Sequence, residues 1–144
     1  MIKNKFLFYF LSFTWGLPMT LIGCVAAVVL LVAGHKPHQY GYCCCFEVGN
    51  GWGGLSLGPI IIVSKSHSDH TKAHEHGHSI QSCWLGFLMP FIVGIPSVIR
   101  YWYREWLAYH NWEKYSKLPE YDAVWYEGSA SSLGHRFIDW YNTK

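Results

Sequence analysis

An uncharged apolar run near the N-terminus constrains the fold of this chain more than any other feature. It covers residues 6–34, and two lysines precede it. A helix needs about 20 apolar residues to cross a bilayer, so the run is long enough. The sequence therefore predicts an integral membrane protein with a transmembrane helix in residues 1–34, kinked at Pro18 because proline removes a backbone donor.

A second uncharged run, residues 83–99, lies in the middle of the chain. Hydropathy alone would make it a second span, but Pro90, Gly94 and Pro96 interrupt it. Proline and glycine break helices, so we expect the chain to turn back near residue 90. The prediction is a hydrophobic hairpin over residues 80–100, covered by protein or by a wet cavity, and a straight span is the alternative.

The segment between these runs contains the candidate strands. Residues 46–48 and 55–63 are rich in apolar and β-branched side chains, and a glycine-rich stretch, 49–54, separates them. This pattern predicts a short β-hairpin, with Pro59 at an edge or a bulge because proline cannot donate to a ladder. An edge strand beside an active site could bind an extended substrate backbone. A hairpin that only covers the active helix is the alternative.

The most specific chemical pattern is His-Glu-x-x-His at residues 74–78. On an α-helix, residues four apart share one face, so His74 and His78 can bind one Zn²⁺. Glu75 projects to an adjacent side, where it can act as the general base of a zinc peptidase. A solvated His-rich segment is the alternative, since nine histidines in 144 residues make chance matches more frequent.

A catalytic zinc ion needs a third protein ligand. Trp84 stands where a metzincin has its third histidine, and the chain has no Asp-Gly of the kind that site-2-protease-like enzymes use. Glu127 begins a Glu-x-x-Ala sequence, as in gluzincins, and small residues that permit close helix packing follow it. Glu120 begins a second such sequence, but an acidic residue in the first turn of a helix explains it equally well. We choose Glu127 as the third ligand.

The same C-terminal region is expected to be helical. The pattern predicts an amphipathic helix over 98–112 and a second helix over 121–133 that Gly134 ends. Asp122 could orient a ligand of the metal, although a solvated carboxylate is the simpler interpretation.

Three motifs follow one another between residues 46 and 134: His-Glu-x-Gly-His-Ser-Ile-Gln-Ser, Gly-Ile-Pro-Ser and Trp-Tyr-Glu-x-x-Ala. Their order resembles that of small membrane-associated, zinc metallopeptidase-like proteins of gluzincin type. The resemblance implies a mainly α membrane protein with a short β-hairpin and a minimal zincin-like core: a transmembrane helix (1–34), then a zincin-like domain (35–144) with the hairpin, the HExxH helix and the glutamate helix. It identifies no residue that stabilises the transition state. The candidates are Tyr121, Tyr126, His110 and His135.

The amino-acid composition excludes one class of partner and favours a location at a membrane. Only 14% of the residues are charged and the formal net charge is +2, which excludes a nucleic-acid partner because lysine and arginine form no stripe. Aromatic residues make up 18% of the chain, which is typical of rings at a lipid boundary. We expect a membrane-anchored zinc metalloendopeptidase at the lipid bilayer, acting on an unknown peptide or protein. The alternative is a non-catalytic membrane interaction or immunity-type protein, or a metal-binding protein, that keeps a zincin-like fold.

Overall fold

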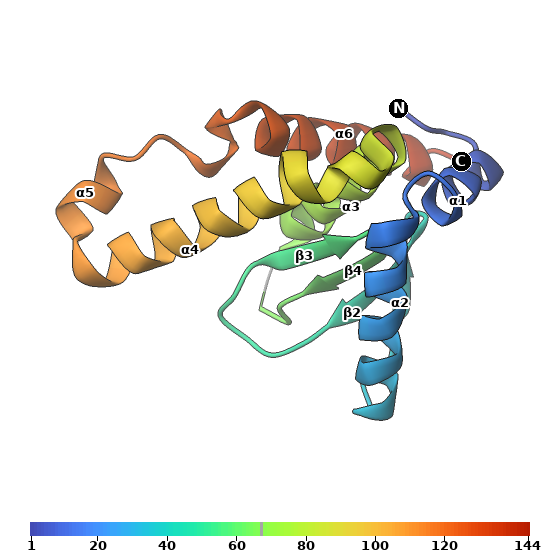
Figure 1. Ribbon diagram of the computed structural model, residues 1–144, viewed down its shortest axis with the longest axis horizontal. Coiled ribbons are helices and arrows are strands. Elements are labelled where there is room, and N and C mark those ends of the chain that lie inside the picture. The colour runs from blue at the N-terminus through green and yellow to red at the C-terminus, as the bar shows by residue number, and fades with distance from the viewer. Residues whose placement is uncertain (67) are drawn as a thin grey trace.

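The computed structural model describes residues 1–66 and 68–144 and is mainly helical, with a small mixed sheet (Figure 1). The helix α3 packs between this sheet and α6. The elements in chain order are α1 (Lys5–Phe13), α2 (Leu17–Val32), β1 (His38–Tyr40), β2 (Cys43–Glu47), β3 (Gly54–Leu57), β4 (Ile60–Val63), α3 (Asp69–Leu85), η1 (Gly86–Leu88), η2 (Pro90–Gly94), α4 (Ile95–His110), α5 (Trp112–Ser116), η3 (Tyr121–Ala123) and α6 (Trp125–Asn142).

The sheet has the order β1-β2-β4-β3, which corrects the predicted hairpin. Strands β2 and β3 flank the glycine-rich stretch, but they are not neighbours, because β4 lies between them. It pairs parallel with β2 and antiparallel with β3. The predicted strand 55–63 is in fact a hairpin of its own, since Gly58 has a positive φ of 64° and Pro59 lies with it in the turn. This arrangement leaves β3 at an edge of the sheet.

The N-terminal apolar run is not the single kinked helix that its composition predicts. It forms α1 and α2, whose axes differ by 93°. The break comes before Pro18, which lies in the first turn of α2. Backbone N–H groups in the first turn have no partner within the helix, so a proline there costs no hydrogen bond. The buried hydroxyl of Thr20 donates to the Ser12 carbonyl at 2.7 Å and so gives a partner to a backbone group near the break.

The second apolar run turns back, as predicted, but not at the residues expected to break it: Pro90 begins η2, and Gly94 and Pro96 lie within the helical stretch 90–110. The helix axis changes direction by 116° between residues 69–88 and 90–110. The turn begins earlier than expected, at Gly86, which has a positive φ of 57° and lies against the indole of Trp15. Trp15 also donates from Nε1 to the Trp84 carbonyl at 3.2 Å, and this bond ties the turn to the break between α1 and α2.

Among the described residues, no single helix has both the length and the apolar composition that a membrane crossing requires. Two bent pairs have both when each pair is counted together: α1 with α2, and residues 69–88 with 90–110. The membrane assignment therefore remains a prediction.

The closest contact between helices in the core is that of α3 with α6. A Cβ atom on Gly77 would lie 1.9 Å from the carbonyl oxygen of Ala130, and one on Gly134 would lie 1.7 Å from that of Ala73. The two helices therefore meet backbone to backbone. The expected end of the last helix at Gly134 is wrong for this reason: α6 starts at Trp125, continues through Gly134 and ends at Asn142.

The other side of α3 faces the apolar core. His76 is fully buried there, and its ring stacks on Phe137 at a centroid distance of 4.3 Å. Its Nε2 accepts a hydrogen bond from the backbone N–H of Tyr42 at 3.2 Å. His76 is therefore a core residue that links α3 to the loop before β2.

The contact between α3 and α6 yields a prediction about stability. At an exposed position within a helix, replacing glycine with alanine stabilises the helix by about 1 kcal/mol. Here we expect Gly134→Ala to destabilise the protein by about 1–3 kcal/mol, because the new methyl group meets backbone that cannot move without separating the helices. Thermal unfolding of the purified protein measures the change, and Ser132→Ala, at an exposed position of α6, is the control. A rise in the melting temperature of Gly134→Ala would contradict the packing described here.

Candidate metal centre

The crossing of α3 and α6 places three potential ligand atoms in one buried group. His74 and His78 lie one turn apart on α3, and their Nε2 atoms are 3.1 Å from each other. The Oε2 atom of Glu127, in the first turn of α6, is 3.1 Å from each of these nitrogens. The structure thus brings together the three residues that the sequence nominates as ligands. Glu120 is exposed, outside this group.

The spacing of these atoms fits one metal ion. Zinc binds histidine nitrogen and carboxylate oxygen at about 2.0–2.1 Å, so two ligands of a tetrahedral ion lie roughly 3.3 Å apart. The observed separations of 3.1 Å are close to this value. Two imidazoles and one carboxylate also form a ligand set that suits zinc. The buried group of His74, His78 and Glu127 could therefore hold a metal ion.

A chain of hydrogen bonds fixes the orientation of His74. The Ser131 hydroxyl donates to Oδ2 of Asp122 at 2.6 Å, and its oxygen lies 2.7 Å from Nδ1 of His74. A hydroxyl has one proton, and here that proton is given to Asp122. Nδ1 of His74 must therefore be the donor to Ser131, which leaves Nε2 as a lone pair facing the group. Asp122, which could have been a solvated carboxylate, is part of this chain.

Gln81 has the same effect on His78. The amide nitrogen of Gln81 donates to the Tyr126 carbonyl and to the Ser129 hydroxyl, each at 2.7 Å. The amide oxygen therefore faces Nδ1 of His78, 2.7 Å away, and accepts its proton. Nε2 of His78 is therefore unprotonated, and it presents a second lone pair to the group. Both imidazoles are thus held in the tautomer that metal binding requires.

Glu127 adds a buried negative charge to these lone pairs. Its side chain is fully buried, and its Oε1 accepts a hydrogen bond from the Ser97 hydroxyl of α4 at 2.5 Å. Burial by itself would raise the pKa of Glu127, but its contacts with the ring nitrogens of His74 and His78 lower it well below its usual range. A metal ion in this group would compete with protons for those nitrogens, so its binding would release protons to the solvent.

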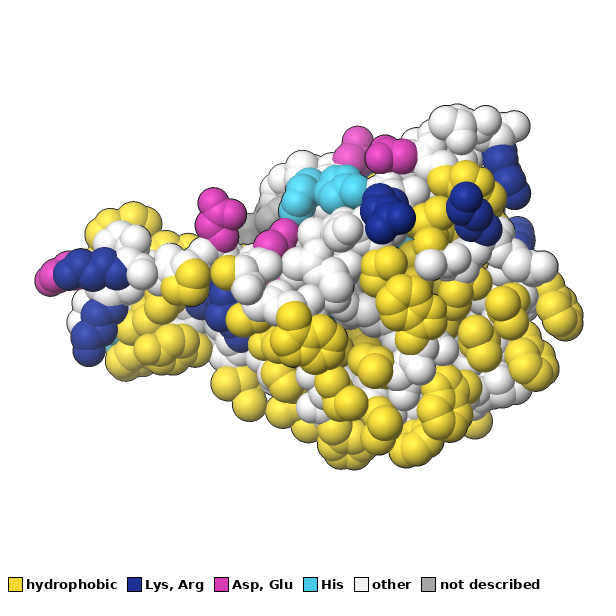
Figure 2. All heavy atoms as spheres, turned by 90° about the horizontal axis from the view of Figure 1, so that it is seen from above, with side chains coloured by type: hydrophobic (Ala, Val, Ile, Leu, Met, Phe, Trp, Pro, Cys, Tyr) yellow, Lys and Arg dark blue, Asp and Glu magenta, His cyan; other side chains and the backbone are white. Residues whose placement is uncertain are grey.

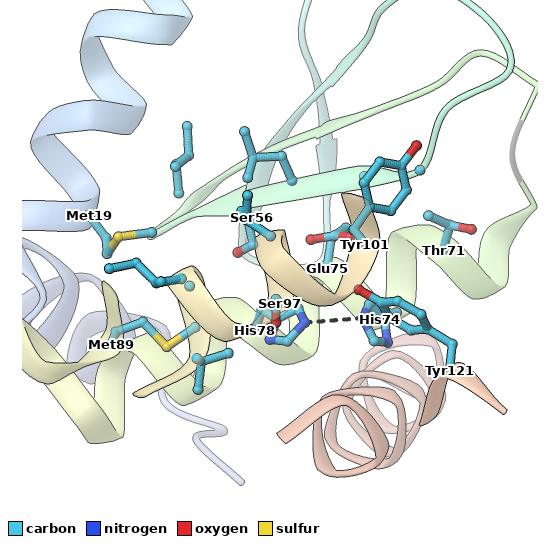
Figure 3. A pocket seen from close by; sticks show the side chains of 18 of the residues that line it. Met19, Ser56, Thr71, His74, Glu75, His78, Met89, Ser97, Tyr101 and Tyr121 are labelled. Carbon is cyan, nitrogen blue, oxygen red and sulfur yellow. Dashed lines mark hydrogen bonds between the residues drawn. The ribbon is translucent and has the colours of Figure 1, made fainter. Parts of the chain in front are cut away.

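A cavity of about 770 Å³ lies beside this group (Figure 3). The helix α3 and the edge strand β3 line one side of it, and η2 with the first turns of α4 lines the other. Glu75 points into the cavity, outside the group of ligand atoms. Gly54 of β3 makes room for it, because a Cβ there would lie 2.6 Å from Oε1 of Glu75. A carboxylate, a potential metal site and an open strand edge therefore share one cavity.

Tyr121 also lines the cavity, and its ring lies 6.3 Å from that of His74 (Figure 3). Burial, the nearby charges of Glu127 and Glu75 and a hydrogen bond to the Glu127 carboxylate raise the pKa of Tyr121, so its hydroxyl stays protonated at alkaline pH. The other candidates for stabilising an oxyanion, Tyr126, His110 and His135, do not line this cavity.

Apart from Asp122, the residues that orient the ligands were not found from the sequence. Two of them follow a ligand at helical spacing: Gln81 is three residues after His78, and Ser131 is four after Glu127. Such spacing places both on the face of their ligand, so it could have identified them. Ser97 comes from α4, and no spacing relates it to the site.

The role of Ser131 can be measured through metal affinity. Ser131→Ala removes the acceptor of the His74 proton, and losses of this kind weaken metal binding by about 10–100-fold. We expect a weaker zinc affinity within that range in competition titrations with a coloured chelator. Ser132→Ala, the next residue and exposed, should bind zinc as the wild type does. Equal affinities of the two variants would show that Ser131 does not hold His74 in place.

No protein-family profile, curated protein or solved structure matches the chain in the comparisons made with it.

Proposed function

We propose that the protein is a membrane-associated zinc metallopeptidase of gluzincin type. The observation that carries the proposal is the buried group of His74, His78 and Glu127 with Glu75 beside it in one cavity. The hydrogen bonds that the two histidines donate to Ser131 and Gln81 support it, because they aim both imidazoles at a shared point. A histidine pair that served only the core would not need a buried carboxylate between its ring nitrogens.

The side chains of the cavity divide the chemistry among them. Zinc, when bound, would polarise the scissile carbonyl and make water a better nucleophile. Glu75 accepts the proton of the attacking water and delivers it to the leaving amine. Tyr121 donates a hydrogen bond to the oxygen on which charge develops. Asp122, through Ser131, keeps His74 in its binding tautomer while this happens.

The edge strand β3 offers a place for the substrate backbone. It is bonded to β4 on one side, and all four of its residues line the cavity. An extended peptide could pair with this edge and gain main-chain hydrogen bonds. Such pairing would hold the peptide beside Glu75, which lies next to Gly54 of the same strand.

Metal content is the direct test of the ligand assignment. We expect about one zinc per chain in the purified wild type and at least a tenfold loss of affinity in Glu127→Ala, because a three-ligand site loses its only carboxylate. Elemental analysis after dialysis measures both. Glu120→Ala is the matched control, since it changes the exposed glutamate of the other Glu-x-x-Ala sequence. Equal zinc in wild type and Glu127→Ala would contradict the assignment.

Glu75→Gln separates catalysis from metal binding. The variant keeps the shape of the side chain but removes its basicity, so we expect zinc content to be unchanged and cleavage of a peptide library to fall by about 10²–10⁴-fold. Mass spectrometry of the cleaved library measures the rate. A wild type that holds zinc and cleaves no peptide would instead favour a metal-binding or interaction protein with a zincin-like site.

Tyr121→Phe tests the proposed hydrogen bond to the developing charge. Loss of one such donor typically lowers kcat by about 10²–10³-fold, and we expect a decrease of this order with little change in KM or zinc content. Because the pKa of Tyr121 is raised, the rate of the wild type should not fall through ionisation of this group near pH 10. Tyr126→Phe, whose ring is outside the cavity, is the control. A Tyr121→Phe enzyme with the kcat of the wild type would remove Tyr121 from the mechanism.

A further inference from the structure

The cavity is bordered by an exposed apolar surface. Several of its lining residues are at the same time among the most exposed apolar side chains of the molecule: Ile22 of α2 is 55% exposed, and Ile99 and Trp102 of α4 are 63% and 65% exposed. The cavity therefore extends from the buried ligand group to the outer surfaces of α2 and α4. Its border there is made of aliphatic and aromatic side chains.

This apolar surface is large. Figure 2 shows hydrophobic side chains gathered along one side of the molecule and many of the charged groups and histidines along the other. The helix α2 has no charged residue, and residues 83–99 have none either. Soluble monomers rarely expose apolar patches of more than a few hundred Å². The exposed apolar residues of α2, the turn and α4 include Leu21, Ile22, Val25, Val28, Val29, Phe87, Phe91, Ile95, Ile99, Trp102, Trp106 and Tyr109.

The arginines of α4 are turned away from this surface. Arg100 donates from Nη2 to the carbonyls of Glu120 and Tyr121 at 3.0 and 3.1 Å, and Arg104 donates from Nη1 to that of Pro119 at 2.8 Å. The side of α4 that remains exposed is mainly aromatic and aliphatic, and the exposed carboxylate of Glu105 lies beside it. Tryptophan and tyrosine rings in such a position are typical of a lipid boundary.

A lipid surface explains these features better than a soluble partner. Specific protein interfaces contain about one hydrogen bond per 100–200 Å², whereas the exposed side of α2 offers almost only hydrocarbon. In the sequence, lysines flank the apolar run of α1 and α2: Lys3 and Lys5 stand at its start, and Lys36 follows it. Lysines in such positions are typical of contacts with anionic headgroups at the edge of a bilayer.

We propose that the cavity opens toward the hydrocarbon of the bilayer, between α2 and α4, and that the substrate is a peptide whose apolar segment lies in the lipid. The inference rests on the proposed peptidase function and names its substrate class. The apolar segment contacts Ile22 and Ile99 at the border of the cavity. The unpaired edge of β3 then gives hydrogen-bond partners to a peptide backbone that has none in lipid.

Two probes test the direction of access with protein reconstituted in phosphatidylcholine vesicles. The first is a peptide library in two forms, one water-soluble and one fused to a membrane-inserting leucine-alanine segment. We expect the fused form to be cleaved at least tenfold faster. The second needs no catalysis: lipid-soluble phenanthroline should remove zinc from the vesicle-bound protein at least tenfold faster than EDTA does.

Variants that place a negative charge at the apolar border of the cavity test the same inference. Ile22→Asp and Ile99→Asp change exposed side chains, so we expect the zinc content of the wild type and a loss of at least tenfold in cleavage of the fused library. Ser132→Asp adds the same charge to an exposed position of α6 and should change neither.

The outcomes distinguish this inference from the peptidase function on which it rests. If the soluble library is cleaved as fast as the fused one, and EDTA acts as fast as phenanthroline, access is from water and the inference is overturned while the peptidase stands. If zinc is bound and neither library is cleaved, both are overturned. A protein that stays monodisperse without detergent and does not float with vesicles also overturns the inference.

Discussion

The direct backbone contact between α3 and α6 is the constraint on which the rest of the structure depends. Two glycines, Gly77 and Gly134, permit the contact, since any side chain at either position would meet the carbonyl of the facing helix. Because the helices are so close, the carboxylate of Glu127 on α6 reaches two imidazoles on α3. The same contact brings Ser131 within hydrogen-bond distance of His74. The ligand group is therefore a consequence of helix packing.

Burial gives this group its chemical character. A carboxylate without access to water is costly unless a cation neutralises it, and the ion-pair partners of Glu127 among the described residues are the two imidazoles. Hydrogen bonds at their Nδ1 atoms direct both lone pairs toward the same carboxylate oxygen. A proton or a metal ion at the centre of the group would neutralise this charge. A bound metal ion would therefore also stabilise the fold.

The turn after α3 connects the site to the outer surface. A straight continuation of the helix would carry α4 away from the site, but the turn at Gly86 brings Ser97 of α4 to Glu127. The following turns of α4 complete the cavity over Glu75. The same turn places the apolar side of α4 on the exposed surface to which α2 also contributes. The single turn after α3 thus brings α4 both to the candidate site and to the exposed apolar surface.

Local patterns were sufficient for the ligands on α3, because helical periodicity alone sets the relation of His74 to His78. The return of the chain was predicted but its position was not, since the turn is at Gly86 while Gly94 and Pro96 lie within helical structure. The bend between α1 and α2 and the parallel pairing of β2 with β4 were not predicted, because both involve contacts between segments apart in the chain: Trp15 with Trp84 at the bend, and Cys44 with Ile60 in the sheet.

The sequence by itself determined which side chains form the candidate site: two histidines one turn apart, a carboxylate beside them and a distant glutamate before a run of small residues. The small residues after Glu127 already favoured it over Glu120, and the tertiary structure brings it to the histidines. Only the tertiary structure decided that Gly134 is a contact surface rather than a helix end. A glycine within a helical pattern has no local signal that distinguishes a stop from a close approach, and the backbone of the facing helix makes that distinction.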